Sequence, residues 1–147
     1  GLMAAALVNE LASLVARDAA AYSAVTAAYK LPGESPADVA KKKDAVTTAL
    51  IGAAEVPLET ARACVRVLEL AEAIAARGNT NAVSDAGVAA LLAEGACRGA
   101  IYNVRINIAA LDDKSKGARL TAECGRLLSQ ASERANAVTA RVEKAIG

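Results

Sequence analysis

Histidine, tryptophan and phenylalanine are all missing from this chain of 147 residues. The absence of histidine excludes His-assisted Ser and Cys nucleophiles and most zinc sites, because both depend on an imidazole. Any acid–base chemistry must therefore come from Asp, Glu, Lys, Tyr or Cys side chains. The only aromatic residues are Tyr22, Tyr29 and Tyr102, and no basic face surrounds them as nucleic-acid bases would require.

Cysteine and long apolar runs are scarce as well. The three cysteines, Cys64, Cys97 and Cys124, are odd in number and widely spaced, which fits neither a disulfide framework nor a metal site. We therefore expect buried free thiols, no bound metal and a reducing, cytoplasmic location. No charge-free apolar run reaches membrane-spanning length and no signal-peptide pattern opens the chain, so no membrane partner is expected.

An excess of charge of one sign is also lacking, since the formal net charge is +1. The only block of like charge is Lys41-Lys42-Lys43, which falls on a predicted helix and fits a solvated face better than a nucleic-acid patch. A nucleic-acid partner is therefore not expected.

Small aliphatic side chains are what the chain has in abundance: 54% of its residues are hydrophobic and only 2% are aromatic. Alanine-rich cores are typical of closely packed helices, because alanine favours the helix and occupies little volume. The length suits one domain, covering residues 1–147. No segment shows the alternation typical of a strand.

Apolar residues recur every three or four positions, which predicts helices over 2–29, 36–55, 57–77, 85–110 and 118–145. Ser35, Pro36 and Asp38 fit the start of the second helix, and Pro57 is expected to kink or restart the chain. Asp18 lies beside the apolar face of the first helix, where a rim charge is the simpler interpretation. The predicted fold class is all-α, a compact multihelical bundle of about five helices.

The chain is organised around residues 77–107. Gly78 and Asn79 are suited to end one helix, and Ser84 or Asp85 to cap the next, which we expect to be buried. Asp85 and Asn103 share one face of that helix but lie about 27 Å apart at 1.5 Å per residue. Either they serve different sites, or a second subunit brings one end to the other. Asn103 and Asn107 are one turn apart, and they either bind one ligand group together or make hydrogen bonds between helices.

This stretch resembles a known family. Residues 78–88 read Gly-Asn-Thr-Asn-Ala-Val-Ser-Asp-Ala-Gly-Val, and residues 103–107 read Asn-Val-Arg-Ile-Asn. Both are similar to the cyclodeaminase domain of the formiminotransferase-cyclodeaminase family, which also includes bacterial methenyltetrahydrofolate cyclohydrolases. Tyr22, residues 28–32 (Ala-Tyr-Lys-Leu-Pro) and residues 56–58 (Val-Pro-Leu) are similar in register, so the resemblance covers roughly Asn9 to Asp113.

The resemblance implies an all-helical homodimer that acts on folate one-carbon units, with a tetrahydrofolate derivative as substrate, no separate cofactor and a possible formiminotransferase partner. The implied reaction is closure of 5-formiminotetrahydrofolate to 5,10-methenyltetrahydrofolate with release of ammonia. The alternatives are a methenyltetrahydrofolate cyclohydrolase and a non-catalytic helical dimerisation module.

The resemblance also suggests roles for individual residues. Asp85 would be the electrostatic partner or base, and Lys30 the acid or a ligand of the substrate's glutamate tail. Arg105 would bind that tail or form an ion pair. The other residues assigned to substrate binding are Tyr29, Asn79, Ser84, Asn103 and Asn107.

One feature of the family is missing. Members carry a Pro-Gly-Gly-Gly-Ser segment near the N-terminus, and this chain has no such segment. Its opening residues resemble the later part of the family's first helix, joined directly to the helix that contains Asp18 and Tyr22. We therefore expect a backbone break within a few residues of Val8. A truncated family member is the alternative.

Overall fold

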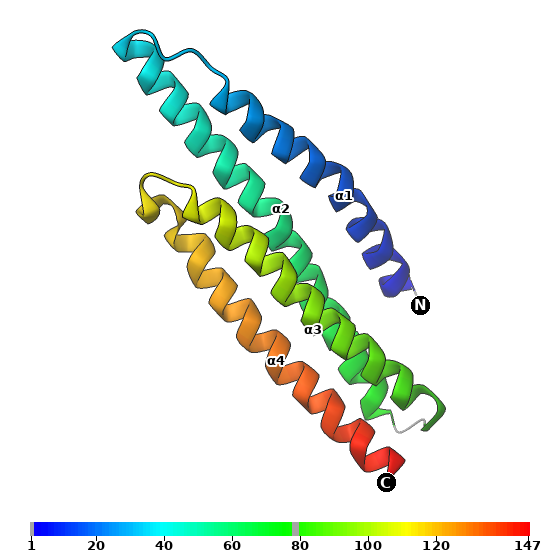
Figure 1. The fold of residues 1–147 in the computed structure, drawn as a ribbon. Coiled ribbons are helices and arrows are strands. Elements are labelled where there is room, and N and C mark those ends of the chain that lie inside the picture. The colour runs from blue at the N-terminus through cyan, green and yellow to red at the C-terminus, as the bar shows by residue number, and fades with distance from the viewer. Residues whose placement is uncertain (1, 78–79) are drawn as a thin grey trace.

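The structure is a computed structural model that describes residues 2–77 and 80–147, with no side-chain placement described for residues 80 and 81. Its elements are α1 (Leu2–Tyr29), α2 (Pro36–Ala76), α3 (Thr80–Ala109), the short 3₁₀ helix η1 (Lys114–Gly117) and α4 (Ala118–Ile146). The all-α prediction is confirmed, and the described part of the chain contains no strand. Figure 1 shows the four long helices side by side as an elongated bundle.

The expectation of about five helices is wrong, because Pro57 lies inside the single helix α2. Proline has no backbone N–H, so the carbonyl of Ala53 one turn earlier loses its helical donor. In the structure the side-chain amide of Asn107, from α3, donates to that carbonyl at 3.3 Å. A neighbouring helix thus replaces the missing hydrogen bond, and α2 continues through the proline.

The start of α2 follows the sequence prediction. Ser35 caps it in an extended conformation and its hydroxyl accepts from the backbone N–H of Asp38 at 3.1 Å. The carboxylate of Asp38 in turn accepts from the backbone N–H of Ser35 at 3.3 Å. This reciprocal pair satisfies free donors at the helix start.

The core is built from α2, α3 and α4. Among the described residues its buried cluster runs from Ala54 to Ala75, from Val83 to Val104 and from Leu120 to Val138, and no residue of α1 belongs to it. Its largest fully buried side chains are Leu58, Leu68, Ile101, Leu120, Val104 and Val138. Helix α2 is central, because it packs against each of the other long helices.

Helix α1 packs on α2 and buries only Leu7, Leu14 and Ala28. The two helices are also joined at the surface, where the Arg17 guanidinium donates to both carboxylate oxygens of Glu59 at 2.5 and 2.7 Å. Arg66 of α2 makes a second ion pair with Glu10 of α1. The helix runs unbroken through Val8 and Asn9, so the expected backbone break is absent. Leu7, Leu11 and Leu14 continue one helical face across that position, which gives the chain no reason to break there.

Helix α3 differs from its prediction at its start and on its outer face. It begins at Thr80, so Ser84 and Asp85 lie inside it and neither acts as its cap. Gly78 and Asn79, expected to end the preceding helix, lie outside the described residues. The helix is buried on one side only, because Val88, Leu92 and other large apolar side chains on the opposite side are exposed.

None of the described helices is both long enough and apolar enough to cross a membrane.

Candidate functional site

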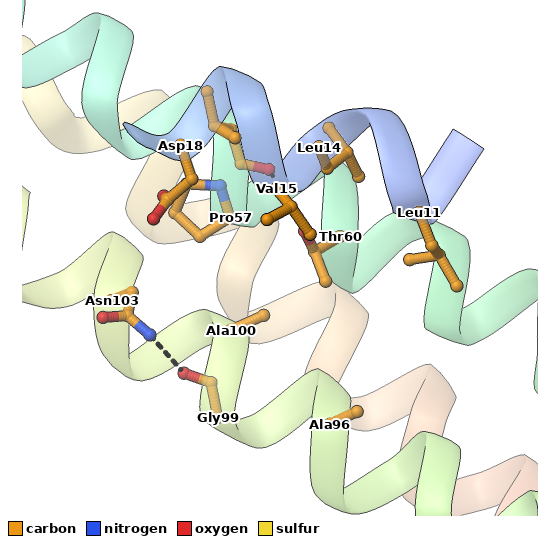
Figure 2. Close-up of a pocket in the computed structure, with 11 residues that line it drawn as sticks. Leu11, Leu14, Val15, Asp18, Pro57, Thr60, Ala96, Gly99, Ala100 and Asn103 are labelled. Atoms are coloured by element: carbon orange, nitrogen blue, oxygen red, sulfur yellow. Dashed lines mark hydrogen bonds between the residues drawn. The ribbon is translucent and has the colours of Figure 1, made fainter. Parts of the chain in front are cut away.

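A pocket of about 420 Å³ lies between α1, α2 and α3 near the middle of the bundle (Figure 2). Its walls are mostly apolar, and Asp18, Thr60 and Asn103 supply the polar side chains. Figure 2 shows Asp18 on α1 and Asn103 on α3 at the same end of the pocket, with Leu11 and Ala96 at the other end. The other lining residues are Leu14, Val15, Val56, Pro57, Gly99 and Ala100.

Small residues leave this space open. Ala96, Gly99 and Ala100 form the α3 wall, and a Cβ atom added at Gly99 would meet no atom within 4 Å. On α2, Pro57 contributes its ring, and the hydroxyl of Thr60 donates to the carbonyl of Val56 at 3.4 Å. The result is a recess with polar groups at one end, a composition typical of small-molecule sites.

The two asparagines, expected either to bind one ligand group together or to make hydrogen bonds between helices, make different contacts. Asn103 faces the pocket, and its Nδ2 donates to the carbonyl of Gly99 at 3.2 Å. Asn107 points toward α2, and its Nδ2 donates to the carbonyls of Ala53 at 3.3 Å and of Asn103 at 3.0 Å. Asn107 therefore makes the inter-helix hydrogen bond of the second alternative, whereas Asn103 lines the pocket.

Asp18 is the pocket residue that sequence reasoning undervalued. It is exposed, as the rim-charge interpretation expects, but the rim it occupies belongs to this pocket. A signal was present in the sequence, because Leu11, Leu14 and Asp18 recur at helical spacing on one face. What the sequence could not supply was the opposing wall, which α3 contributes from far along the chain.

Asp85 lies in a different recess. This second groove, of about 470 Å³, also runs between α1, α2 and α3 and shares Leu11 with the first pocket. Asp85 is its only charged residue, and the rest of its lining is aliphatic. Ser84, the residue before Asp85 in the helix, is exposed. Asp85 is the sixth residue of α3 and lies beyond its first turn.

The remaining predicted residues lie elsewhere. Tyr29 lines a hollow of about 410 Å³ with Lys42, Lys43 and Asp112, and Lys43 and Asp112 form an ion pair at 3.6 Å. Lys30 is exposed in the turn after α1. Arg105 is exposed on the side of α3 near α4, where its charge opposes the burial that raises the pKa of the Cys124 thiol. Asn79 lies outside the described residues.

The predicted residues are thus spread along the bundle. Asp85 shares a groove with Ala4 and Val8 near the start of α1, whereas Lys30 follows the end of the same helix. At 1.5 Å per residue this separates Lys30 and Asp85 by on the order of 30 Å. Within one copy they cannot act on the same small chemical group.

Several charged and titratable groups lie away from the pocket of Asp18 and the groove of Asp85. On the face between α2 and α4, Arg62 donates to both carboxylate oxygens of Glu123 at 2.7 and 2.9 Å, which lowers the pKa of Glu123. Burial raises the pKa of the Cys97 thiol to about 11. The three cysteines are free and buried, as predicted. In the part of the chain that the structure describes, no cluster of three Cys, Asp or Glu side chains is arranged to hold a metal ion.

Comparison with known proteins identifies the family of this chain. The family model described as Formiminotransferase-cyclodeaminase matches residues 2–126, which is most of the chain. The chain belongs to the formiminotransferase-cyclodeaminase family. The resemblance drawn from the residue 78–88 and 103–107 segments is therefore confirmed.

Two relatives show how far the family likeness extends. The chain is 39% identical over 121 residues to a methenyltetrahydrofolate cyclohydrolase of Methylorubrum extorquens, covering 82% of this chain and 58% of that protein. It is 34% identical over 134 residues to a formimidoyltransferase-cyclodeaminase of Sus scrofa, covering 91% of this chain and 25% of that one.

A solved structure agrees with the fold. The chain is similar to the crystal structure of a formiminotetrahydrofolate cyclodeaminase from Thermotoga maritima, with a TM-score of 0.77 and 25% sequence identity. The match covers 92% of this chain and 63% of that one. The chain thus spans less than two thirds of the length of each of these family members.

Proposed function

We propose that this family member acts on folate one-carbon units and closes 5-formiminotetrahydrofolate to 5,10-methenyltetrahydrofolate with release of ammonia. The observation that carries this proposal is the family match over residues 2–126, which contains the pocket between α1, α2 and α3 and the whole of α3. The cyclodeaminase names of the vertebrate and Thermotoga relatives support the same reaction.

The proposed ring closure needs carboxylate and amide side chains, and the two neighbouring pockets supply both. In the reaction, folate N10 bonds to the formimino carbon, the bond from that carbon to its amino group breaks, and a proton passes from N10 to the departing ammonia. The formimino group is cationic, so a carboxylate beside it stabilises the charge and accepts a proton. We assign both roles to Asp85, and assign Asp18 and Asn103, which line the neighbouring pocket, to binding of the folate.

A cyclohydrolase is the second candidate. The 39% identity to the Methylorubrum cyclohydrolase is higher than the 34% identity to the Sus scrofa enzyme and supports this alternative. In that reaction water adds to the methenyl carbon and the bond from this carbon to N5 breaks, which yields the 10-formyl form. The same carboxylate would then remove one proton from water rather than from N10, and the second proton of that water passes to N5.

The proposed working state is a cytoplasmic homodimer that needs no metal or separate cofactor. Three buried free thiols suit a reducing compartment. The joint name of the Sus scrofa relative suggests a formiminotransferase as a functional partner. A metal chelator should leave turnover unchanged, and a loss of turnover would contradict the metal-free proposal.

Absorbance in the near ultraviolet tests the reaction, because the methenyl bridge forms a chromophore. The purified protein is mixed separately with 5-formimino- and with 5,10-methenyltetrahydrofolate. Growth of the chromophore from the formimino compound, together with ammonia, is expected of a cyclodeaminase. Accelerated loss from the methenyl compound alone identifies a cyclohydrolase. Absence of change in both mixtures, with folded protein, would overturn both enzyme proposals and favour the dimerisation module.

The variant Asp85→Asn tests the assigned carboxylate. It keeps the shape of the side chain but removes its charge, so turnover should fall by on the order of 1,000-fold, within the range of an electrostatic and acid–base role. Asp44→Asn is the matched control, because Asp44 is exposed on α2 outside the described pockets. Equal turnover by the two variants would remove Asp85 from the proposed mechanism.

A further inference from the structure

Another cavity lies at the end of the bundle where α1 finishes. This hollow, of about 410 Å³, is bounded by the last residue of α1, the first half of α2 and the chain that follows α3. These segments lie in the upper left part of Figure 1. The volume of the hollow falls within the range of small-molecule sites. Its lining residues are Tyr29, Val39, Lys42, Lys43, Val46, Thr47, Leu50, Ala110 and Asp112.

Part of the lining is apolar. The aliphatic residues of the hollow are Val39, Val46, Leu50 and Ala110. Leu50 is buried and Val46 is half-buried, so the apolar surface continues into the bundle. Covering such surface with an apolar group removes it from water, which is favourable. The hollow therefore suits a ligand with an apolar body.

Three polar side chains of the hollow have hydrogen-bond donors that are not used within the protein. In the part of the chain that the structure describes, the side chains of Tyr29, Lys42 and Thr47 make neither a hydrogen bond nor an ion pair. By contrast, the hydroxyl of Thr26, one turn before Tyr29, donates to the carbonyl of Tyr22 at 3.1 Å. A helical hydroxyl is often satisfied in that way inside its own helix. The two hydroxyls and the ammonium group are therefore available to a ligand.

The charges of the hollow favour a monoanion. Lys43 and Asp112 form an ion pair at 3.6 Å, and both side chains are mostly exposed. Lys42 is half-buried and, among the described residues, has no carboxylate within ion-pair distance. Water screens a half-buried charge less than an exposed one, so Lys42 attracts an anion more strongly than a surface lysine does. A second negative charge on the ligand would be repelled by Asp112.

We propose that this hollow binds a small carboxylic acid in its ionised form. The carboxylate accepts hydrogen bonds from Lys42, Tyr29 and Thr47, and the bond from the ammonium is the strongest of these because both partners are charged. The body of the acid covers the aliphatic part of the lining. A flat aromatic acid such as benzoate supplies both parts.

The hollow is separate from the cavities of the proposed reaction. It shares no lining residue with the pocket of Asp18 or with the groove of Asp85. At 1.5 Å per residue, Tyr29 lies about 16 Å from Asp18 along α1, and Ala110 lies about 10 Å from Asn103 along α3. Binding of an acid in the hollow therefore does not depend on the folate reaction.

Two sources can supply the same carboxylate chemistry. One is a separate small acid. The other is the glutamate of a folate that lies in the pocket of Asp18 and extends along the bundle, and this source rests on the proposed function.

A titration with benzoate, followed by amide nuclear magnetic resonance of the whole chain, tests the site without any assay of activity. Benzoate should shift the signals of Val46 and Thr47 and leave those near Asp85 unchanged. Lys42→Gln should raise the dissociation constant for benzoate about tenfold, because it removes a charge-assisted hydrogen bond. Lys41→Gln is the matched control, since Lys41 is exposed and does not line the hollow. Equal affinities of these two variants, or no shift at the hollow, would overturn the proposal.

Benzamide and inorganic phosphate separate the two halves of the ligand. Benzamide keeps the shape of benzoate without its charge, and phosphate keeps a charge without an apolar body. Each should bind at least about tenfold more weakly than benzoate. Phosphate that binds as tightly as benzoate would show that the aliphatic lining does not take part, and would overturn the assignment to a carboxylic acid.

Kinetics of the folate reaction identify the source of the carboxylate. If the folate glutamate occupies the hollow, Lys42→Gln should raise KM about tenfold with little change in kcat, and benzoate should compete with the folate. If a separate acid occupies it, KM should stay unchanged and both ligands should bind together. An inactive wild type that still binds benzoate through Lys42 would contradict the proposed function and leave the hollow as a carboxylate site.

Discussion

At the scale of single residues, Asn107 and Pro57 are the most informative pair. Both belong to segments similar to the family pattern, and the structure joins them through one carbonyl. Pro57 removes the helical donor of the Ala53 carbonyl, and the Asn107 amide replaces it from α3. Because unsatisfied buried carbonyls are costly, the amide permits a proline in the middle of α2. The Asn107 side chain therefore stabilises the fold, whereas the Asn103 side chain lines the pocket.

This coupling is testable by a double-mutant cycle. Asn107→Ala should lower the free energy of unfolding by about 1–2 kcal/mol, since it leaves the Ala53 carbonyl without a donor. In a Pro57→Ala background the backbone N–H of residue 57 returns, and the same substitution should cost distinctly less. Urea unfolding of the four proteins measures the difference. An equal cost in both backgrounds would show that the two residues are independent.

The lowered pKa of Glu123 predicts how the stability of the fold depends on pH. Hydrogen bonds from Arg62 lower the pKa of this carboxyl below its ordinary value of 4.5. Because the pKa is lower in the folded state, the stabilisation is present above about pH 4.5 and is lost as the pH falls through the folded pKa.

The variant Glu123→Gln should be about 1 kcal/mol less stable than the wild type at pH 7. The gap should narrow as the pH falls below about 4.5 and the wild-type carboxyl becomes protonated. Urea midpoints at pH 7 and at a series of lower pH values measure this. Glu133→Gln, at an exposed position of α4, should match the wild type at each of them. A gap between wild type and Glu123→Gln that persists at low pH would show that charge is not its cause.

At the scale of elements, the contact between α3 and α4 depends on Gly87. A Cβ atom at this buried position would lie 2.9 Å from Cγ2 of Val142 and 3.6 Å from its Cγ1. The branched valine has no long flexible end that can move away. The two helices therefore approach as closely as they do because residue 87 has no side chain.

Gly87→Ala should destabilise the protein by about 1–2 kcal/mol through this clash. Adding Val142→Ala should recover part of the loss, because it removes the clashing methyl groups. Gly95→Ala is the matched control on the same helix, where open space lets the better helix former stabilise by up to about 1 kcal/mol. Thermal unfolding compares the variants. A stabilising Gly87→Ala would show that α3 and α4 separate at little cost.

At the scale of the whole molecule, stability is unevenly distributed. The buried cluster of the described residues joins α2, α3 and α4, whereas α1 is held by three buried side chains and by ion pairs with α2. Exposed ion pairs contribute little, so α1 is the least firmly attached long helix. Since α1 forms one wall of both pockets, this attachment bears directly on the proposed function.

Hydrogen exchange should show this difference. The amides of α1 should exchange at least about tenfold faster than those in the middle of α2, because local opening of α1 does not break the shared cluster. Leu14→Ala should speed exchange in α1 while leaving α3 and α4 unchanged. Mass spectrometry of peptic fragments measures both. Equal protection of all four helices would show that α1 unfolds only with the rest.

The sequence by itself determined the helices, because each was encoded locally by apolar periodicity and by signals such as Ser35 and Pro36. It also determined the family, since that depended on residues contiguous in the chain. Two local signals misled. Pro57 looked like a helix boundary, because the hydrogen bond that keeps α2 continuous comes from another helix. Ser84 and Asp85 looked like caps, although α3 begins earlier, at Thr80.

Only the tertiary structure decided which residues meet. The pocket joins Asp18, Pro57 and Asn103, which are separated by 39 and 46 positions in sequence and have no local pattern in common. The fold places Asp85 and Lys30 at opposite ends of the bundle. One copy therefore cannot use both residues at one chemical group. The physical reason is that periodicity specifies which face of a helix is apolar. The identity of the helix that packs there depends on the whole fold.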